Sequence, residues 1–144
     1  MQMPTGSGDD LIRIAAVQMN SRGDKAENIR TALELIDRAA AGGTRLVALP
    51  EVWSYLGDQD GNRDNAEPIP GPLTDLLAQT ARERRIYLHA GSVYEIEPGN
   101  PRVLNTTVVF NPDGDLIAKY SKIHMFDVVL DGVATYQESA TVSP

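Results

Sequence analysis

The sequence of 144 residues contains no cysteine. A chain without cysteine forms no disulfide, offers no cysteine ligand to zinc and carries no thiol nucleophile. It also lacks any apolar run near the ~20 residues that span a bilayer. Acidic residues outnumber basic ones, and the formal net charge of −7 disfavours nucleic acid and anionic membranes as partners. The composition therefore predicts a protein that acts without nucleic acid and without a membrane.

The length and composition predict one folded domain with its own core. The apolar share of 42% and the charged share of 23% are ordinary for a soluble globular protein. Residues 1–10 are rich in Gly, Ser, Thr and Asp, and they lack the basic-then-apolar order of a signal peptide. We therefore expect a disordered leader over residues 1–10, a folded part over residues 11–144 and a cytoplasmic location.

The first fifty residues follow the order strand, helix, strand. Residues 11–18 are nearly continuous in apolar residues, which predicts a strand that is covered on both faces. Asp24 followed by Glu27 fits a capping box at a helix start, and Gly42 marks the helix end. The apolar positions of this helix share one face: Ile29, Leu33, Ile36 and Ala40. A second strand over residues 44–49 completes a βαβ pattern.

The rest of the chain predicts one more helix and three more strands. Pro72 is typical of a first helical turn. The apolar positions that follow it are Leu73, Leu76, Leu77 and Ala81. Strands are predicted at 86–93, 103–110 and 116–120, and an Asn-Pro-Asp-Gly turn between the last two favours an antiparallel hairpin. This order predicts an α/β fold with a mixed sheet and helices on one face. No element is predicted for residues 128–144.

Two charged residues stand where a site would form. Glu51 follows directly on the second strand, and ligand crevices form at the carboxyl ends of strands in open α/β sheets. Partial desolvation there would make its carboxylate a usable base; the alternative is an acidic residue at a solvated strand end. Lys122 and His124 share a face of an extended segment, where a lysine either stabilises an oxyanion or extends along the surface. His89 lies within a predicted strand and receives no role.

Four segments in this order resemble the nitrilase, or carbon–nitrogen hydrolase, superfamily. They are Val17-Gln18, Leu49-Pro50-Glu51, the run Tyr-Ser-Lys-Ile-His-Met-Phe-Asp at 120–127, and the weaker match Tyr-Gln-Glu-Ser at 136–139. The resemblance extends from Leu11 to the last residue. It implies an α-β-β-α sandwich of two similar halves, of which this chain supplies the first.

The resemblance also implies a chemistry. In this family a glutamate takes the proton from a cysteine thiol, the thiolate attacks an amide or nitrile carbon, and a lysine stabilises the tetrahedral intermediate. By position, Glu51 matches the base, Lys122 the lysine and Glu138, less closely, a further glutamate that orients substrate. The substrate would be a small amide or nitrile, of the kind the amidase branches take. No cofactor and no metal is implied, and the parent protein is expected to be a homo-oligomer.

The missing cysteine separates two hypotheses. In the family it lies on a later strand, so the first hypothesis is an inactive fragment that is truncated before the nucleophile. The second is a complete small α/β ligand-binding or interaction domain, in which Glu51 and Lys122 are incidental. The absence of cysteine supports the second hypothesis, and the ordered motifs speak against it. The first one predicts that Glu51 and Lys122 meet, and that one apolar face of the sheet stays open.

Overall fold

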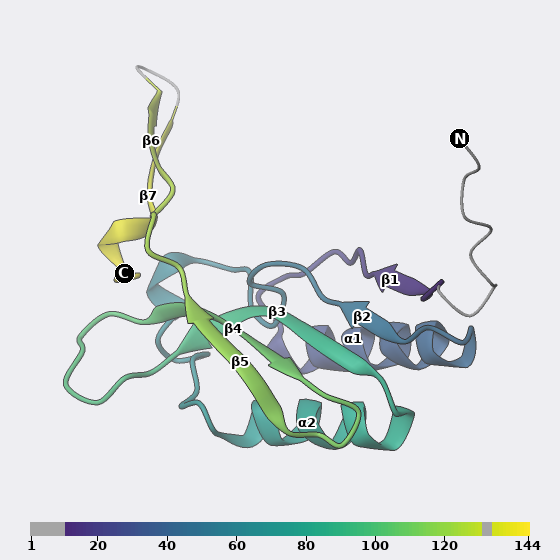
Figure 1. The fold of residues 1–144 in the computed structure, drawn as a ribbon. Coiled ribbons are helices and arrows are strands. Elements are labelled where there is room, and N and C mark those ends of the chain that lie inside the picture. The colour runs from purple at the N-terminus through teal and green to yellow at the C-terminus, as the bar shows by residue number, and fades with distance from the viewer. Residues whose placement is uncertain (1–10, 131–133) are drawn as a thin grey trace, which may run out of the picture.

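The computed structural model describes residues 11–130 and 134–144. Residues 1–10, the predicted leader, lie outside the described residues. Figure 1 shows a sheet of five strands with two helices on one of its faces, and a separate two-stranded hairpin. The strands are β1 (Ile14–Ala16), β2 (Leu46–Ala48), β3 (Tyr87–Glu95), β4 (Leu104–Phe110), β5 (Leu116–Ser121), β6 (Asp127–Leu130) and β7 (Ala134–Gln137). The helices are α1 (Lys25–Ala41) and α2 (Pro72–Arg84), with short 3₁₀ helices at Gln59–Gly61 and Glu138–Ala140. The predicted α/β class is confirmed.

The sheet is mixed, and its strands follow one another in chain order. β1, β2 and β3 are parallel, whereas β3, β4 and β5 are antiparallel neighbours. Tyr94 near the end of β3 therefore pairs with Asn105 at the start of β4, and Thr106 pairs with Ser121 at the end of β5. One end of the sheet thus gathers the carboxyl ends of β2, β3 and β5 with the amino end of β4.

The core lies between the sheet and the two helices. Its buried apolar side chains come from both helices, the strands and the segments that flank them: Ala32, Ile36, Val47, Leu49, Trp53, Leu73, Leu77, Ala81, Ile86, Leu88, Ala90, Val93, Val108 and Phe110. The side chain of Asp24 accepts a hydrogen bond from the Glu27 amide at 3.0 Å, which caps α1 as the sequence predicted. Leu33 and Leu76 are only half-buried, because the helices turn other residues toward the sheet.

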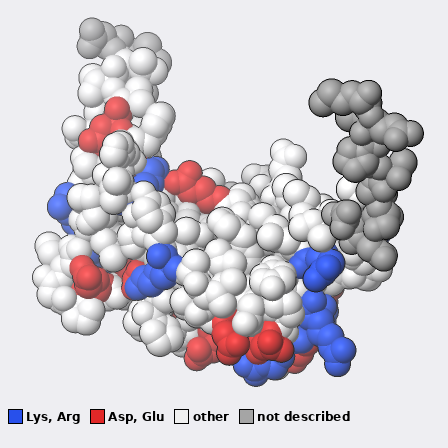
Figure 2. All heavy atoms as spheres, in the orientation of Figure 1, with Lys and Arg blue, Asp and Glu red and all other residues white. Residues whose placement is uncertain are grey.

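The opposite face of the sheet is largely uncovered among the described residues. Ile14 is 65% exposed and Tyr120 is 58% exposed. The prediction that the first strand is covered on both faces is therefore wrong: β1 is three residues long, lies at the sheet edge and packs only through its helix-facing side. Uncharged residues cover most of the surface seen in Figure 2, and charged ones lie along its lower rim and over its left-hand part. No described helix is both long and apolar enough to cross a membrane.

Strands β6 and β7 form a hairpin that the sequence did not predict. β6 and β7 pair antiparallel, with Asp127 opposite Gln137, and the hairpin stands away from the main sheet in Figure 1. At its base, the rings of Phe126 and Tyr136 lie 6.1 Å apart. Glu95, which lies beyond the strand predicted at 86–93, ends β3 as a buried residue and pairs with Lys119.

Candidate active site

The backbone around Glu51 is held by a tight contact between β3 and the end of β2. The Ser92 amide donates to the Pro50 carbonyl at 3.1 Å. Gly91 has φ +60°, and a Cβ on it would lie 1.9 Å from the Pro50 carbonyl oxygen. Only glycine fits there, because the left-handed backbone is unfavourable for a residue with a Cβ and because that Cβ would clash with the neighbouring carbonyl. This contact fixes where the chain leaves β2 and where Glu51 begins.

Val52, the residue after Glu51, takes an unusual conformation. Its φ is +49°, which is rare for a β-branched residue. Its amide donates to Ser92 Oγ at 3.0 Å in a buried position. Nearby, the Trp53 indole N–H donates to the Ala90 carbonyl at 2.7 Å. Hydrogen bonds to the Ser92 hydroxyl and the Ala90 carbonyl of β3 therefore stabilise the strained turn that carries Glu51.

Lys122 lies between two carboxylates. Its Nζ is 3.0 Å from Glu51 Oε1 and 2.9 Å from Glu138 Oε2. Lys122 follows β5 and Glu138 follows β7, so three separate segments meet here. The predicted approach of Glu51 to Lys122 is confirmed. Of the two alternatives for Glu51, the structure favours the solvated strand end, because its side chain is 60% exposed among the described residues.

The two carboxylates differ in burial and in bonding. The Glu138 side chain is 6% exposed, and its Oε2 also accepts the Phe126 amide at 2.6 Å. Burial alone would raise the pKa of Glu138, but hydrogen bonds from Phe126, Lys122 and Asn105 outweigh it and lower that pKa. For Lys122 burial would lower the pKa, but Glu138 and Glu51 outweigh it and raise that pKa. Lys122 therefore stays charged at neutral pH.

Asn105 is the member of the cluster that the sequence did not predict. Its side chain is buried, and Nδ2 donates to Glu51 Oε1 at 2.9 Å and to Glu138 Oε1 at 3.3 Å. The Lys122 amide donates to the Asn105 carbonyl at 2.8 Å. A usable signal existed, because an asparagine inside a predicted apolar strand needs a polar partner when it is buried.

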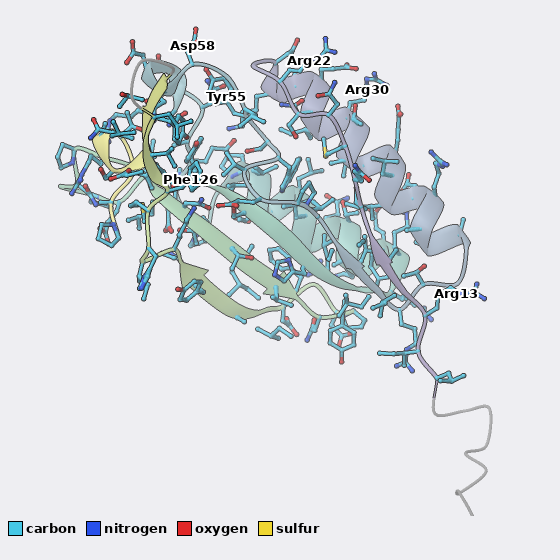
Figure 3. All side chains as sticks on the ribbon, turned by 90° about the horizontal axis from the view of Figure 1, so that it is seen from above. Arg13, Arg22, Arg30, Tyr55, Asp58 and Phe126 are labelled. Atoms are coloured by element: carbon cyan, nitrogen blue, oxygen red, sulfur yellow. The ribbon has the colours of Figure 1, made fainter. Side chains whose placement is uncertain are left out.

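Two hollows flank the Glu51–Lys122 pair. One, of about 230 Å³, opens on the uncovered sheet face and is lined in part by His89, Thr107 and Tyr120. The other, of about 220 Å³, lies toward the hairpin, with Tyr94, Phe126 and Tyr136 in its wall. Seen from above in Figure 3, Tyr55 and Phe126 lie at this end of the sheet and Arg13 at the opposite end. Both hollows have room for a small molecule beside the charges.

The chemistry that this arrangement offers is acid–base and electrostatic. Burial, with the nearby charges of Tyr136, Glu138 and Glu51, raises the pKa of Tyr94, so its hydroxyl stays neutral. His89 accepts the Gly91 amide on Nδ1 at 3.2 Å, which leaves Nε2 toward Thr107. Across residues 11–130 and 134–144, no three His, Asp or Glu side chains gather as a metal site requires. The cluster is thus one ammonium group shared by two carboxylates.

Comparison with known proteins decides the family. The family model described as carbon–nitrogen hydrolase matches residues 13–144. The chain belongs to the carbon–nitrogen hydrolase family. The human omega-amidase NIT2 is 41% identical over 132 residues, which cover 92% of this chain and 47% of the human protein. Omega-amidase NIT2-B of Xenopus laevis is 42% identical over the same length and coverage.

Solved structures of carbon–nitrogen hydrolases agree with the fold. Saccharomyces cerevisiae Nit3, a member of branch 10 of the nitrilase superfamily, superposes with a TM-score of 0.76 at 33% identity. The superposition covers 48% of the Nit3 chain and 92% of this chain. The C. elegans NitFhit protein gives a TM-score of 0.79 at 26% identity, over 92% of this chain and 34% of that one. The chain thus spans about half the length of the curated relatives it matches, at 47%.

Proposed function

We propose that this chain carries the glutamate–lysine half of a hydrolase site that cleaves the terminal amide of a small carboxylic acid. The observation that supports it is Lys122 held between Glu51 and Glu138, with a hollow on either side. The omega-amidase relatives support an amide as the substrate. The alternative is a binding domain in which Glu51 and Lys122 form an incidental charge pair. Such a pair would not require that a second carboxylate, Glu138, share the same lysine.

The roles follow from the exposure of each group. Glu51 is exposed beside both hollows, so it is the group that reaches a thiol or a water molecule and takes its proton. Lys122 stays charged and faces the same hollows, where it stabilises the oxyanion that forms on the amide carbon. Glu138 is buried and fully bonded, so it holds Lys122 in place. The sequence has no cysteine, and the thiol nucleophile comes from the polypeptide that completes the site.

The experiment joins this chain to the C-terminal half of an omega-amidase relative and measures ammonia release from a monoamide of a small dicarboxylic acid. We expect turnover by the joined protein and none by the 144-residue chain alone. Glu51→Gln should lower kcat about 10²–10⁴-fold, as loss of a general base does. Lys122→Met should lower it about 10²–10³-fold, as loss of one oxyanion donor does.

Lys119→Met is the matched control. Lys119 lies on β5, near Lys122 in the chain, and pairs with the buried Glu95, whose side chain is 6% exposed like that of Glu138. Its loss should reduce stability as much as the loss of Lys122 while kcat stays unchanged. Ammonia release by the chain alone, or a joined protein that is indifferent to both site substitutions, would contradict the proposal.

A further inference from the structure

Asn105 forms hydrogen bonds with all three charged members of the cluster. Its Nδ2 reaches both carboxylates, at 2.9 Å for Glu51 and 3.3 Å for Glu138. Its carbonyl accepts the Lys122 amide at 2.8 Å. The residue is 2% exposed. Since ionised carboxylates only accept hydrogen bonds, the amide orientation with Nδ2 toward them follows from the chemistry of its partners.

The cluster needs a neutral donor because its charges do not balance. Two carboxylates share one ammonium group, and two like charges at one site disfavour each other. Asn105 supplies both of its N–H groups to these carboxylates without adding a charge. An aspartate of the same size would add a third negative charge and remove both donors.

The bonds also distinguish the four carboxylate oxygens. Oε1 of Glu51 accepts from both Lys122 and Asn105, while Oε2 of Glu51 has no hydrogen-bond partner among the described residues. In Glu138 both oxygens are engaged, Oε2 by Phe126 and Lys122, and Oε1 by Lys122 and Asn105. One oxygen of the cluster is therefore left to take a proton.

We propose that Asn105 is a positioning residue that, together with Lys122, anchors Oε1 of Glu51 and so presents Oε2 as the proton acceptor. This inference rests on the proposed function, because Glu51 must be the base. Asn105 acts through Glu51 and does not contact the substrate. Since Glu51 is 60% exposed, its carboxylate has freedom to rotate away, and Asn105 restricts it. Misplacement of a reacting group by about 1 Å costs on the order of 10²-fold in rate.

The first test uses the 144-residue chain and no reaction. Carboxyl ¹³C NMR follows the titration of Glu138, whose pKa is lowered, against the effect of burial, partly by Asn105. Asn105→Ala and the isosteric Asn105→Asp should both raise that pKa, and Asn105→Asp should raise it more. Asn28→Ala is the control, because Asn28 is also buried and donates two side-chain bonds, at 2.6 and 3.0 Å, but to backbone carbonyls. An unchanged Glu138 titration in both Asn105 variants would overturn the proposal.

The second test measures kcat and KM in the joined protein. Asn105→Ala should lower kcat on the order of 10²-fold with KM unchanged, whereas Asn28→Ala should leave kcat unchanged. A normal kcat in both Asn105 variants would overturn the positioning role. If the joined protein releases no ammonia while the Glu138 titration still responds to Asn105, the proposed function fails and the organising role of Asn105 in the cluster stands.

Discussion

The ion pair between Lys122 and Glu138 should stabilise the fold, whereas the pair between Lys122 and Glu51 should contribute little. The N–O distances are nearly equal, at 2.9 and 3.0 Å, but the side-chain exposures are 6% and 60%. Solvent screens the exposed pair, and such pairs contribute about 0.2–1 kcal/mol. A hydrogen bond to a buried charged group contributes about 1.5–3 kcal/mol. Burial therefore separates the two pairs where distance does not.

Double-mutant cycles measure this difference directly. Urea unfolding of Lys122→Met, Glu138→Gln, Glu51→Gln and the two double variants gives each coupling free energy. Trp53, the one tryptophan of the sequence, is 0% exposed and reports unfolding by fluorescence. We expect a coupling of about 1.5–3 kcal/mol with Glu138 and at most about 1 kcal/mol with Glu51. Equal couplings, or a larger one with Glu51, would refute the argument from burial.

Three further predictions concern the fold around the site. Gly91→Ala should lower the free energy of unfolding by at least about 2 kcal/mol, since the left-handed backbone alone costs about 1–2 kcal/mol and the new Cβ would clash with the Pro50 carbonyl. Gly99 is the control, because its φ is +82° but no atom lies within 4 Å of an added Cβ. Gly99→Ala should therefore cost only the backbone part, and equal losses of stability in the two variants would contradict this reasoning. The folded-state pKa of Glu138 lies below its ordinary value of 4.5, so its stabilisation is complete above that value and is lost as pH falls through the lowered pKa. The urea midpoint of the wild type should therefore fall as the pH is lowered through this range, and that of Glu138→Gln should fall less. The same pH dependence in both proteins would count against this prediction. Tyr120→Lys, on the uncovered sheet face, should reduce binding of a hydrophobic dye; no dye binding by the wild-type chain would contradict an exposed apolar face.

The elements with strong periodic patterns could be predicted from the sequence. Both helices begin where Asp24 and Pro72 indicate, and the strands at residues 44–49, 86–93 and 103–110 differ from β2, β3 and β4 mainly at their ends. Strand burial was predicted less well, because an apolar run does not show whether a second layer covers it. This is why the first strand was expected to be buried and is an exposed edge.

The candidate site could be predicted in part. Glu51 and Lys122 stand in short motifs of fixed order, and the structure brings them together. An asparagine inside an apolar strand signals a polar partner, but the partners of Asn105 lie on separate segments of the chain, which no local pattern records. The β6–β7 hairpin was missed because its strands are short, with four residues each.

The site joins residues at two very different separations along the chain. Lys122 and Glu138 are 16 residues apart, whereas Glu51 and Lys122 are 71 apart. Loop-closure entropy grows with the logarithm of loop length, which makes the longer closure costlier by about 1.3 kcal/mol. During refolding the Lys122–Glu138 contact should therefore form first, with the hairpin. Glu51 joins only when the parallel strands have paired, so Glu51 is the last of the three charged residues to reach the cluster.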